Sequence, residues 1–201
     1  MGRQRSSSST TSLEASRRGG LSPFGATANH DADSVLVTLR DASAALVFVA
    51  RRDSMPPTTQ TQLDTVATLP GYFGAEAVYS PLGDTAFVGT KTVESSGDIT
   101  VYSVDLTTGA TSPVVSTTVT PVTFGINLWL AVSEDGRELL LQRNVTDGGC
   151  TLDYVDVSTG QIQYSRTITS HRGAESGDCG NWQAGFSPVS GLTPVIGGGT
   201  R

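Results

Sequence analysis

Residues 77–88 read AVYSPLGDTAFV and residues 130–141 read LAVSEDGRELLL, so one short turn between two apolar runs occurs twice, with Ser80 and Ser133 lying 53 positions apart. Residues 26–37, ATANHDADSVLV, form a weaker copy, and residues 184–188, AGFSP, begin another. Pro presets a turn dihedral and Gly accepts positive φ, so each copy predicts a β-hairpin. Recurrence at a fixed spacing indicates a repeat architecture.

A second turn motif keeps the same period. Residues 104–109 read VDLTTG and residues 155–160 read VDVSTG, with Asp105 and Asp156 lying 51 positions apart. An Asp side chain accepts hydrogen bonds from the next backbone amides, and the Gly closes the turn. Two hairpin motifs in one repeat predict a four-stranded antiparallel sheet as the repeating unit.

Composition agrees with a chain built from short strands and tight turns. The 201 residues include 23 Gly, and only 16 % are charged. No window shows an apolar stripe of helical period, so we predict an all-β fold with almost no helix. The predicted strands are 26–29, 34–40, 44–50, 62–69, 75–80, 84–90, 98–105, 111–119, 126–133, 137–143, 150–157 and 161–168.

The Ser-Pro-x-Gly-Asp turn, the apolar strand after it and the Val-Asp-Leu-x-Thr-Gly turn together resemble the WD-like repeats of bacterial β-propellers, which include surface-layer and lactonase-like proteins. The resemblance covers residues 26–196. It implies a β-propeller fragment with about three four-stranded antiparallel blades, at approximately 26–70, 75–120 and 126–169, plus the start of a fourth at 182–201. The Trp-Asp pair of eukaryotic WD repeats is missing, because Tyr102 to Asp105 occupies that zone without Trp.

Three blades are fewer than the four to eight of closed propellers. The last strands would therefore present an unpaired edge. Two explanations follow: the chain is a fragment whose missing blades lie in the rest of a longer protein, which we prefer, or the ring closes by self-association.

Residues 1–22 differ in composition from residues 23–201, which we assign to the partial propeller. They are basic and Ser-rich, with Arg3, Arg5, Arg17 and Arg18, and predict a disordered tail; an organelle transit peptide is the alternative. No apolar run suits a signal peptide or a membrane span. The net charge of −6 disfavours nucleic acid as a partner. The compartment stays unknown, with an extracytoplasmic location favoured.

The connection before the fourth blade gathers the candidate binding residues. His171, Glu175 and Asp178 lie in this polar stretch and Trp182 follows it. Such connections lie on a propeller face near the central channel, which makes these four the predicted ligand-binding residues. A metal site would combine His171, Glu175, Asp178 and Cys179 with Cys150, but their spacing matches no zinc-ligand pattern, so we expect no metal. The two cysteines suggest a disulfide closing a loop of about 30 residues, and two free thiols are the alternative.

No catalytic motif emerges from the chain. The stretch around Ser187 breaks the Gly-x-Ser-x-Gly nucleophile-elbow pattern at its last position, Val189, and no phosphate-binding loop, EF-hand or dinucleotide fingerprint is present. We expect a noncatalytic interaction or ligand-binding module without cofactor, whose protein or small-molecule partner is unknown. The alternatives are the propeller part of an enzyme, lactonase-like or hydrolase-associated, and a structural cell-surface repeat protein. Whether any reaction is catalysed stays open, and we lean towards none.

Overall fold

The computed structural model describes residues 22–29, 31, 34–40, 44–51, 64–71, 73–92, 97–119, 128–144, 150–168, 182–186 and 194–198, and these ranges hold strands and turns but no helix. The strands are β1 (Ser22–Ala28), β2 (Ser34–Arg40), β3 (Ala44–Arg51), β4 (Asp64–Pro70), β5 (Phe73–Tyr79), β6 (Thr85–Lys91), β7 (Gly97–Asp105), β8 (Thr111–Val119), β9 (Leu128–Val132), β10 (Glu138–Asn144), β11 (Cys150–Asp156), β12 (Ile162–Ile168), β13 (Trp182–Phe186) and β14 (Pro194–Gly198). The predicted strands match these to within a few residues at most ends. The predicted tail, residues 1–22, lies outside the described residues except for Ser22, the first residue of β1.

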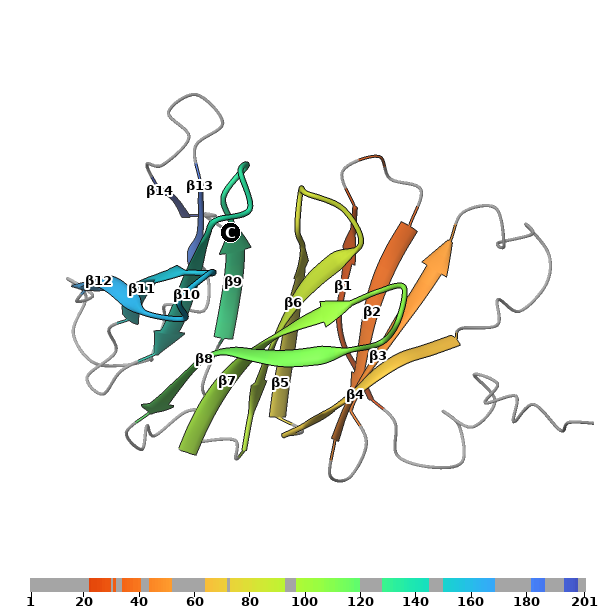
Figure 1. Ribbon diagram of the computed structural model, residues 1–201. Helices are drawn as coiled ribbons and strands as arrows, with labels where there is room; N and C mark the ends of the chain where they lie inside the picture. Colours follow the sequence, from red (N-terminus) through yellow and green to blue (C-terminus); the bar gives the residue numbers. More distant parts are fainter. Residues whose placement is uncertain are drawn as a thin grey trace, which may run out of the picture.

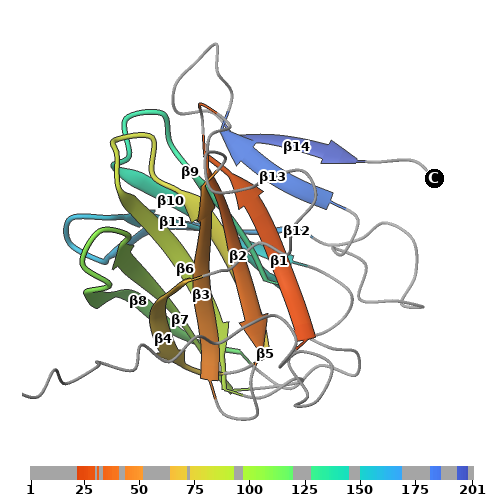
Figure 2. The same ribbon diagram turned by 90° about the vertical axis from the view of Figure 1, so that its right-hand side faces the viewer.

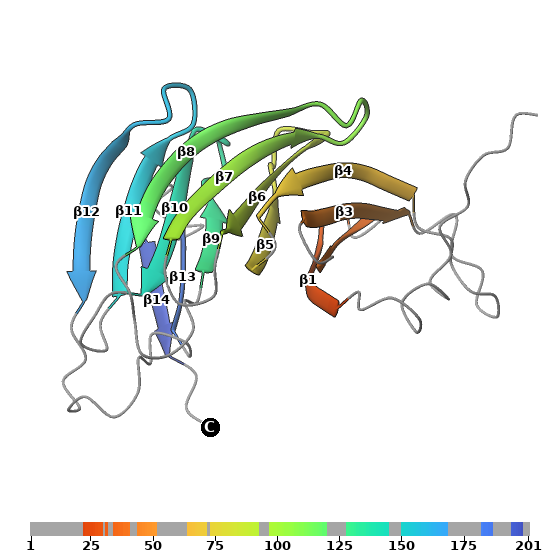
Figure 3. The same ribbon diagram turned by 90° about the horizontal axis from the view of Figure 1, so that it is seen from below.

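The strands form three four-stranded antiparallel sheets, each made of four consecutive strands, and a two-stranded sheet follows. The sheet orders are β1-β2-β3-β4, β5-β6-β7-β8 and β9-β10-β11-β12, and β13 pairs with β14. Figure 1 shows the sheets standing side by side, and Figure 3 shows them fanned in an open arc. The chain therefore has the all-β architecture of a partial β-propeller.

The first strand of each sheet lies on the inner side of the arc. β1 neighbours β5, β5 neighbours β9, and β9 neighbours β13, whereas β4, β8 and β12 lie at the periphery. Figure 2 shows β13 and β14 beyond the third sheet, in the place of a fourth blade. The inner strands thus form a wall in which successive repeats contribute equivalent positions.

The repeated turns occupy equivalent corners of successive sheets. The backbone N–H groups of Asn29, Ser80 and Ser133 donate to carbonyl oxygens five residues later, at 3.0, 2.8 and 2.9 Å. These bonds close the β1–β2, β5–β6 and β9–β10 hairpins in the same way. The predicted alignment of Ser80 with Ser133 is confirmed, and Ser187 lies outside the described residues.

The Asp-x-x-x-Gly turns also repeat in detail. The N–H groups of Gly109 and Gly160 each donate to the carbonyl oxygen of the turn Asp, both at 2.8 Å. Asp105 accepts N–H bonds from Thr107 and Thr108 through one carboxylate oxygen. Both glycines have φ near +70°, a region that side-chain-bearing residues rarely adopt. The two motifs found in the sequence therefore form the β7–β8 and β11–β12 turns.

Apolar side chains between neighbouring sheets form the core. One cluster fills the space between the first and second sheets, with Leu36, Val47, Leu69, Val88 and Val104 among its members. A second cluster fills the space between the second and third sheets; it contains Phe87, Ile99, Val101, Leu128, Leu130, Leu139, Leu141 and Val155. Burial of these β-branched and aliphatic side chains holds the sheets face to face, because each sheet alone would expose both faces to water.

Candidate functional site

Equivalent positions on the inner strands carry different side chains in each repeat. Glu76 on β5 pairs with Gly89, Trp129 on β9 pairs with Gln142, and Gln183 on β13 pairs with Gly197. All three inner residues lie four positions before the Ser of the hairpin turn. Equivalent register positions of the inner strands are therefore occupied by Glu76, Trp129 and Gln183.

Glu76 faces the third sheet together with Lys91. Glu76 pairs with Gly89, two residues before Lys91, so the side chains of Glu76 and Lys91 project from the same face of the sheet. A Cβ placed on Gly89 would approach Leu128 on β9, which identifies this face as the one packed on the third sheet. Lys91 is 6 % exposed and Glu76 is half-buried. Two opposite charges thus lie at the boundary between two blades.

The environment of Glu76 favours its neutral form. Burial raises the pKa of Glu76 from 4.5 to about 7, against the opposing effect of the positive charge on Lys91. A carboxyl group with a pKa near neutrality exchanges its proton in the physiological range, and it donates a hydrogen bond when protonated and accepts when ionised. Perturbed ionisable groups of this kind are concentrated at functional sites.

Glu76 and Lys91 lie near one edge of the arc, which we call the connection edge: here β4, β6, β8, β10 and β12 end and β5, β7, β9, β11 and β13 begin. The β4–β5 connection is held against β6, because the Thr90 hydroxyl donates to the Pro70 carbonyl at 2.8 Å. Gly71, with φ of +87°, lies against the Lys91 carbonyl. The β4–β5 connection therefore lies against the end of β6, the strand that carries Lys91.

The predicted binding residues also belong to a connection at this edge. His171, Glu175, Asp178 and Cys179 lie outside the described residues, in the segment between β12 and β13. Trp182 is the first residue of β13 and its backbone pairs with Gly198. Their roles therefore stay predictions.

Cys150, at the start of β11, is buried and is not a free thiol. Since Cys179 lies outside the described residues, the pairing of the two cysteines also stays a prediction.

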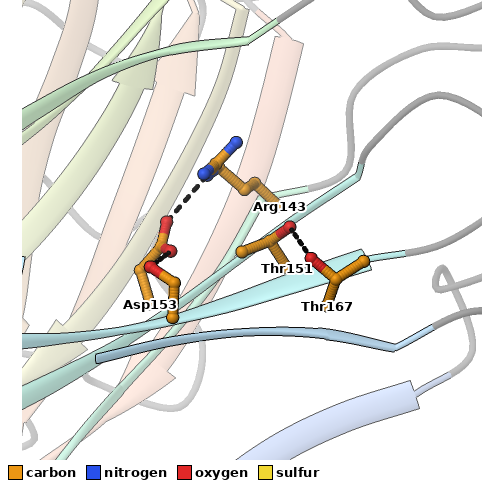
Figure 4. A network of polar contacts seen from close by, with 5 residues as sticks. Arg143, Thr151, Asp153 and Thr167 are labelled. Carbon is orange, nitrogen blue, oxygen red and sulfur yellow. Dashed lines mark hydrogen bonds and ion pairs between the residues drawn. The ribbon is translucent and has the colours of Figure 1, made fainter.

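A second charged group lies farther out in the same interface. Asp153 on β11 is completely buried and accepts from Arg143 Nε at 2.7 Å and from the Ser165 hydroxyl at 2.6 Å. Next to it, the hydroxyls of Thr151 and Thr167 lie 3.4 Å apart. Figure 4 shows Arg143 and Asp153 directed at each other above this strand pair. The network joins β10, β11 and β12 and satisfies both oxygens of a carboxylate that would otherwise be costly to bury.

Several other carboxylates are committed to turns. Backbone N–H bonds from Thr108 and Thr107 lower the pKa of Asp105. The Ser158 hydroxyl and the Thr159 N–H lower the pKa of Asp156 in the equivalent turn. These groups stabilise the turns as carboxylates, as predicted from their place in the repeat.

Glu76, Lys91 and Asp153 are the residues that sequence reasoning did not single out for a site. A signal for Glu76 exists, since it is the one charge in the run GAEAV of an inner strand. Lys91 is the single lysine of the sequence. For Asp153 the alternation of side chains along the strand does not distinguish the inward face from the outward one.

In the described parts of the chain, no group of three or more His, Cys, Asp or Glu residues is arranged to hold a metal ion, and no helix is long and apolar enough to span a membrane.

Comparisons with known proteins support the fold. No family model matches the sequence, and no curated protein matches it. The structure resembles the periplasmic gluconolactonase of Pseudomonas aeruginosa, with 20 % identity, a TM-score of 0.54, and coverage of 88 % of this chain and 47 % of that one. It also resembles the β-propeller domain of the trilobed protease of Pyrococcus furiosus, with 11 % identity, a TM-score of 0.50, and coverage of 75 % and 44 %.

These similarities have two consequences. The chain spans less than half the length of each of these two propeller proteins. At such low identity the similarity establishes the β-propeller fold alone. The WD-like details of the repeat rest on the sequence resemblance.

Proposed function

We propose that this chain is a noncatalytic β-propeller module that binds a small polar ligand at the connection edge, between the second and third blades. The observation that carries the proposal is the placement of Glu76 and Lys91. Both come from the inner half of one blade, both face its neighbour, and both are withdrawn from water. Burying opposite charges costs more than packing apolar side chains there, so a stacking role alone does not account for them.

The chemistry of the pair defines the ligand class. An ammonium group offers three donors, and a carboxyl group near its pKa donates or accepts. A ligand carrying hydroxyl groups and an anionic group, such as a sugar acid, would match the hydrogen-bonding capacity of both groups. The predicted residues His171, Glu175, Asp178 and Trp182 leave or enter the fold at the same edge, and we include them in the proposed site.

NMR of the full chain tests binding directly. Amide spectra are recorded with D-gluconate, D-glucose and glycine as probes, at a pH below and a pH above the pKa of Glu76. We expect shifts from D-gluconate that centre on Glu76 and Lys91 and are reduced in Glu76→Gln and Lys91→Gln. Glu134→Gln, which changes an exposed turn residue, is the matched control. Absence of shifts with all probes, or shifts centred elsewhere, would contradict this site.

The alternative is an enzymatic role, favoured by the similarity to a gluconolactonase. In that case Glu76 would act as an acid or base on a bound lactone, since its pKa of about 7 suits proton transfer. The rate of glucono-δ-lactone hydrolysis distinguishes the two roles, and it is measured from the acid released into a weak buffer. We expect the rate with the protein to equal the rate without it. Acceleration that is lost in Glu76→Gln would establish the enzymatic alternative.

A further inference from the structure

The outer strand of each complete blade contains one extra residue at the same place. The register slips by one residue between β3 and β4 at Val66, between β7 and β8 at Val114, and between β11 and β12 at Gln163. A β-bulge leaves its extra residue unpaired and turns its backbone groups out of the ladder. Each blade therefore presents one bulge on its outermost strand.

The next blade covers the first two bulges with the glycine of its Asp-x-x-x-Gly turn. A Cβ on Gly109 would meet the Val66 carbonyl oxygen, and a Cβ on Gly160 would meet the Val114 carbonyl oxygen. Each glycine lies four positions after the Asp of a Val-Asp pair. Bulge and glycine thus form a repeated docking contact between neighbouring blades.

Apolar residues around the turn complete the contact. Val104 and Leu106 flank the first turn Asp and pack in the cluster that includes Val66. Val155 and Val157 flank the second turn Asp and pack in the cluster that includes Val114. The docking element is therefore a hairpin with the pattern Val-Asp-(Leu/Val)-x-Thr-Gly.

The third bulge is exposed. The residue after each bulge is Ala67, Val115 and Tyr164, and these are 6 %, 7 % and 58 % exposed, respectively. Gln163 itself is exposed, and among the glycines that the structure describes none has it as a nearest neighbour. Beneath it the Tyr154 and Tyr164 rings lie 5.8 Å apart, on the face that carries Leu140 and Leu152.

The neighbouring sheet leaves this surface uncovered. β13 lies beside β9 and also reaches β10, so the two-stranded sheet continues the stacking only over the inner half of the third blade. The surface that adjoins the β9–β13 interface on its outer side, with Gln163 and Tyr164, is therefore not covered by β13 or β14.

We propose that the outer face of β11 and β12 is a docking surface for a β-hairpin closed by an Asp-x-x-x-Gly turn, with its glycine on the Gln163 carbonyl and its flanking apolar residues on Tyr154 and Tyr164. The occupant is the outer half of the blade that β13 and β14 begin. This inference concerns assembly and does not depend on what the inner strands bind.

The test supplies the hairpin from the chain's own sequence. A copy of residues 97–119, which contain the Gly109 turn and no cysteine, is appended after Arg201 through a short Gly-Ser linker. The control carries Val in place of the copied Gly109. We expect the intact copy to raise the Tm by about 4 °C or more and to slow amide exchange across β12 at least about tenfold. The Val copy should do neither.

A substitution in the receiving surface provides the second arm. Tyr164→Glu leaves the Tm of the unextended chain unchanged, since Tyr164 is exposed, but it should abolish the gain from the intact copy. Equal Tm and exchange for the intact and Val copies would overturn the proposal. So would a dimer of the unextended chain, seen by sedimentation and dissociated by Tyr164→Glu, because a second copy would then be the occupant.

Discussion

Replacing Glu76 by Gln should change how the stability of the protein depends on pH. Glu76 binds its proton more tightly in the folded state, with a pKa of about 7, than in the unfolded state, with a pKa of 4.5. Between these two values the folded state therefore holds a proton that the unfolded state has lost. The free energy of unfolding of the wild type falls as pH rises through this window, and the contribution of this group is constant above it.

The magnitude follows from the size of the pKa shift. One pKa unit corresponds to about 1.4 kcal/mol, so the full shift corresponds to about 3 kcal/mol. Because solvent reaches part of the side chain, we reduce this by about half and expect a loss of about 1–2 kcal/mol. Lys91 on the same face opposes the shift, and the ion pair of Arg143 with Asp153 lies farther out in the same interface.

Urea unfolding of both proteins at intervals from pH 5 to pH 8.5 measures the difference. The Gln variant should gain about 1–2 kcal/mol relative to wild type as pH rises across this range, with most of the change between pH 5 and pH 7. The turn carboxylates with lowered pKa values titrate below this range. The histidines are the same in both proteins, so their contribution cancels in the difference between the two free energies of unfolding. Glu134→Gln, which removes one carboxylate from an exposed turn position, is the matched control. A flat curve for Glu76→Gln would refute the inference that this carboxyl is desolvated between blades.

Three further outcomes are expected. Gly160→Ala should lower the free energy of unfolding, measured in urea, by about 2–4 kcal/mol, and Gly136→Ala should lower it by about 1 kcal/mol. Both glycines have a similar positive φ, but a Cβ at Gly160 meets a backbone carbonyl oxygen, whereas a Cβ at Gly136 meets the end of an exposed leucine side chain. Equal costs would contradict blade docking through Gly160. Arg143→Met should cost about 3 kcal/mol by leaving Asp153 buried without its cation, and adding Asp153→Leu should recover most of it in a double-mutant cycle; additive losses would argue against the pair. Cys150→Ser should lower stability by about 3 kcal/mol if the predicted disulfide closes its loop, with thiol titration of the denatured wild type finding no free thiol until a reductant is added; two thiols titrating at once would disprove the bridge.

The repeat could be predicted from the sequence because turns are specified locally. Ser80 and Gly83 occupy one turn, and its backbone hydrogen bonds, from the Ser80 N–H to the Thr85 carbonyl and from the Thr85 N–H to the Gly83 carbonyl, span at most five positions. Strand pairing then follows from hairpin geometry and alternation. The same locality explains why Asp105 was correctly assigned to a turn.

The candidate site could not be predicted in this way, because it depends on which face of a sheet meets which neighbour. Glu76 becomes a buried charge only when β9 packs over Gly89, and β9 is far away along the chain. Likewise, Pro113 beside the bulge at Val114 indicates an edge strand or an irregularity, but no such residue stands beside the equivalent bulges at Val66 and Gln163. Both features are set by stacking between sheets, which the hairpin motifs do not specify.

Each of the three complete sheets consists of four consecutive strands, so none of these three includes a strand from elsewhere in the part of the chain that the structure describes. A ribosome releasing this polypeptide would therefore complete one sheet roughly every fifty residues, and the hairpins of that sheet involve only short loop closures. Each finished sheet would then offer an apolar face on which the following sheet packs, so the sheets would assemble in the direction of synthesis. Cotranslational folding intermediates should accordingly contain whole blades rather than isolated pairs of distant strands.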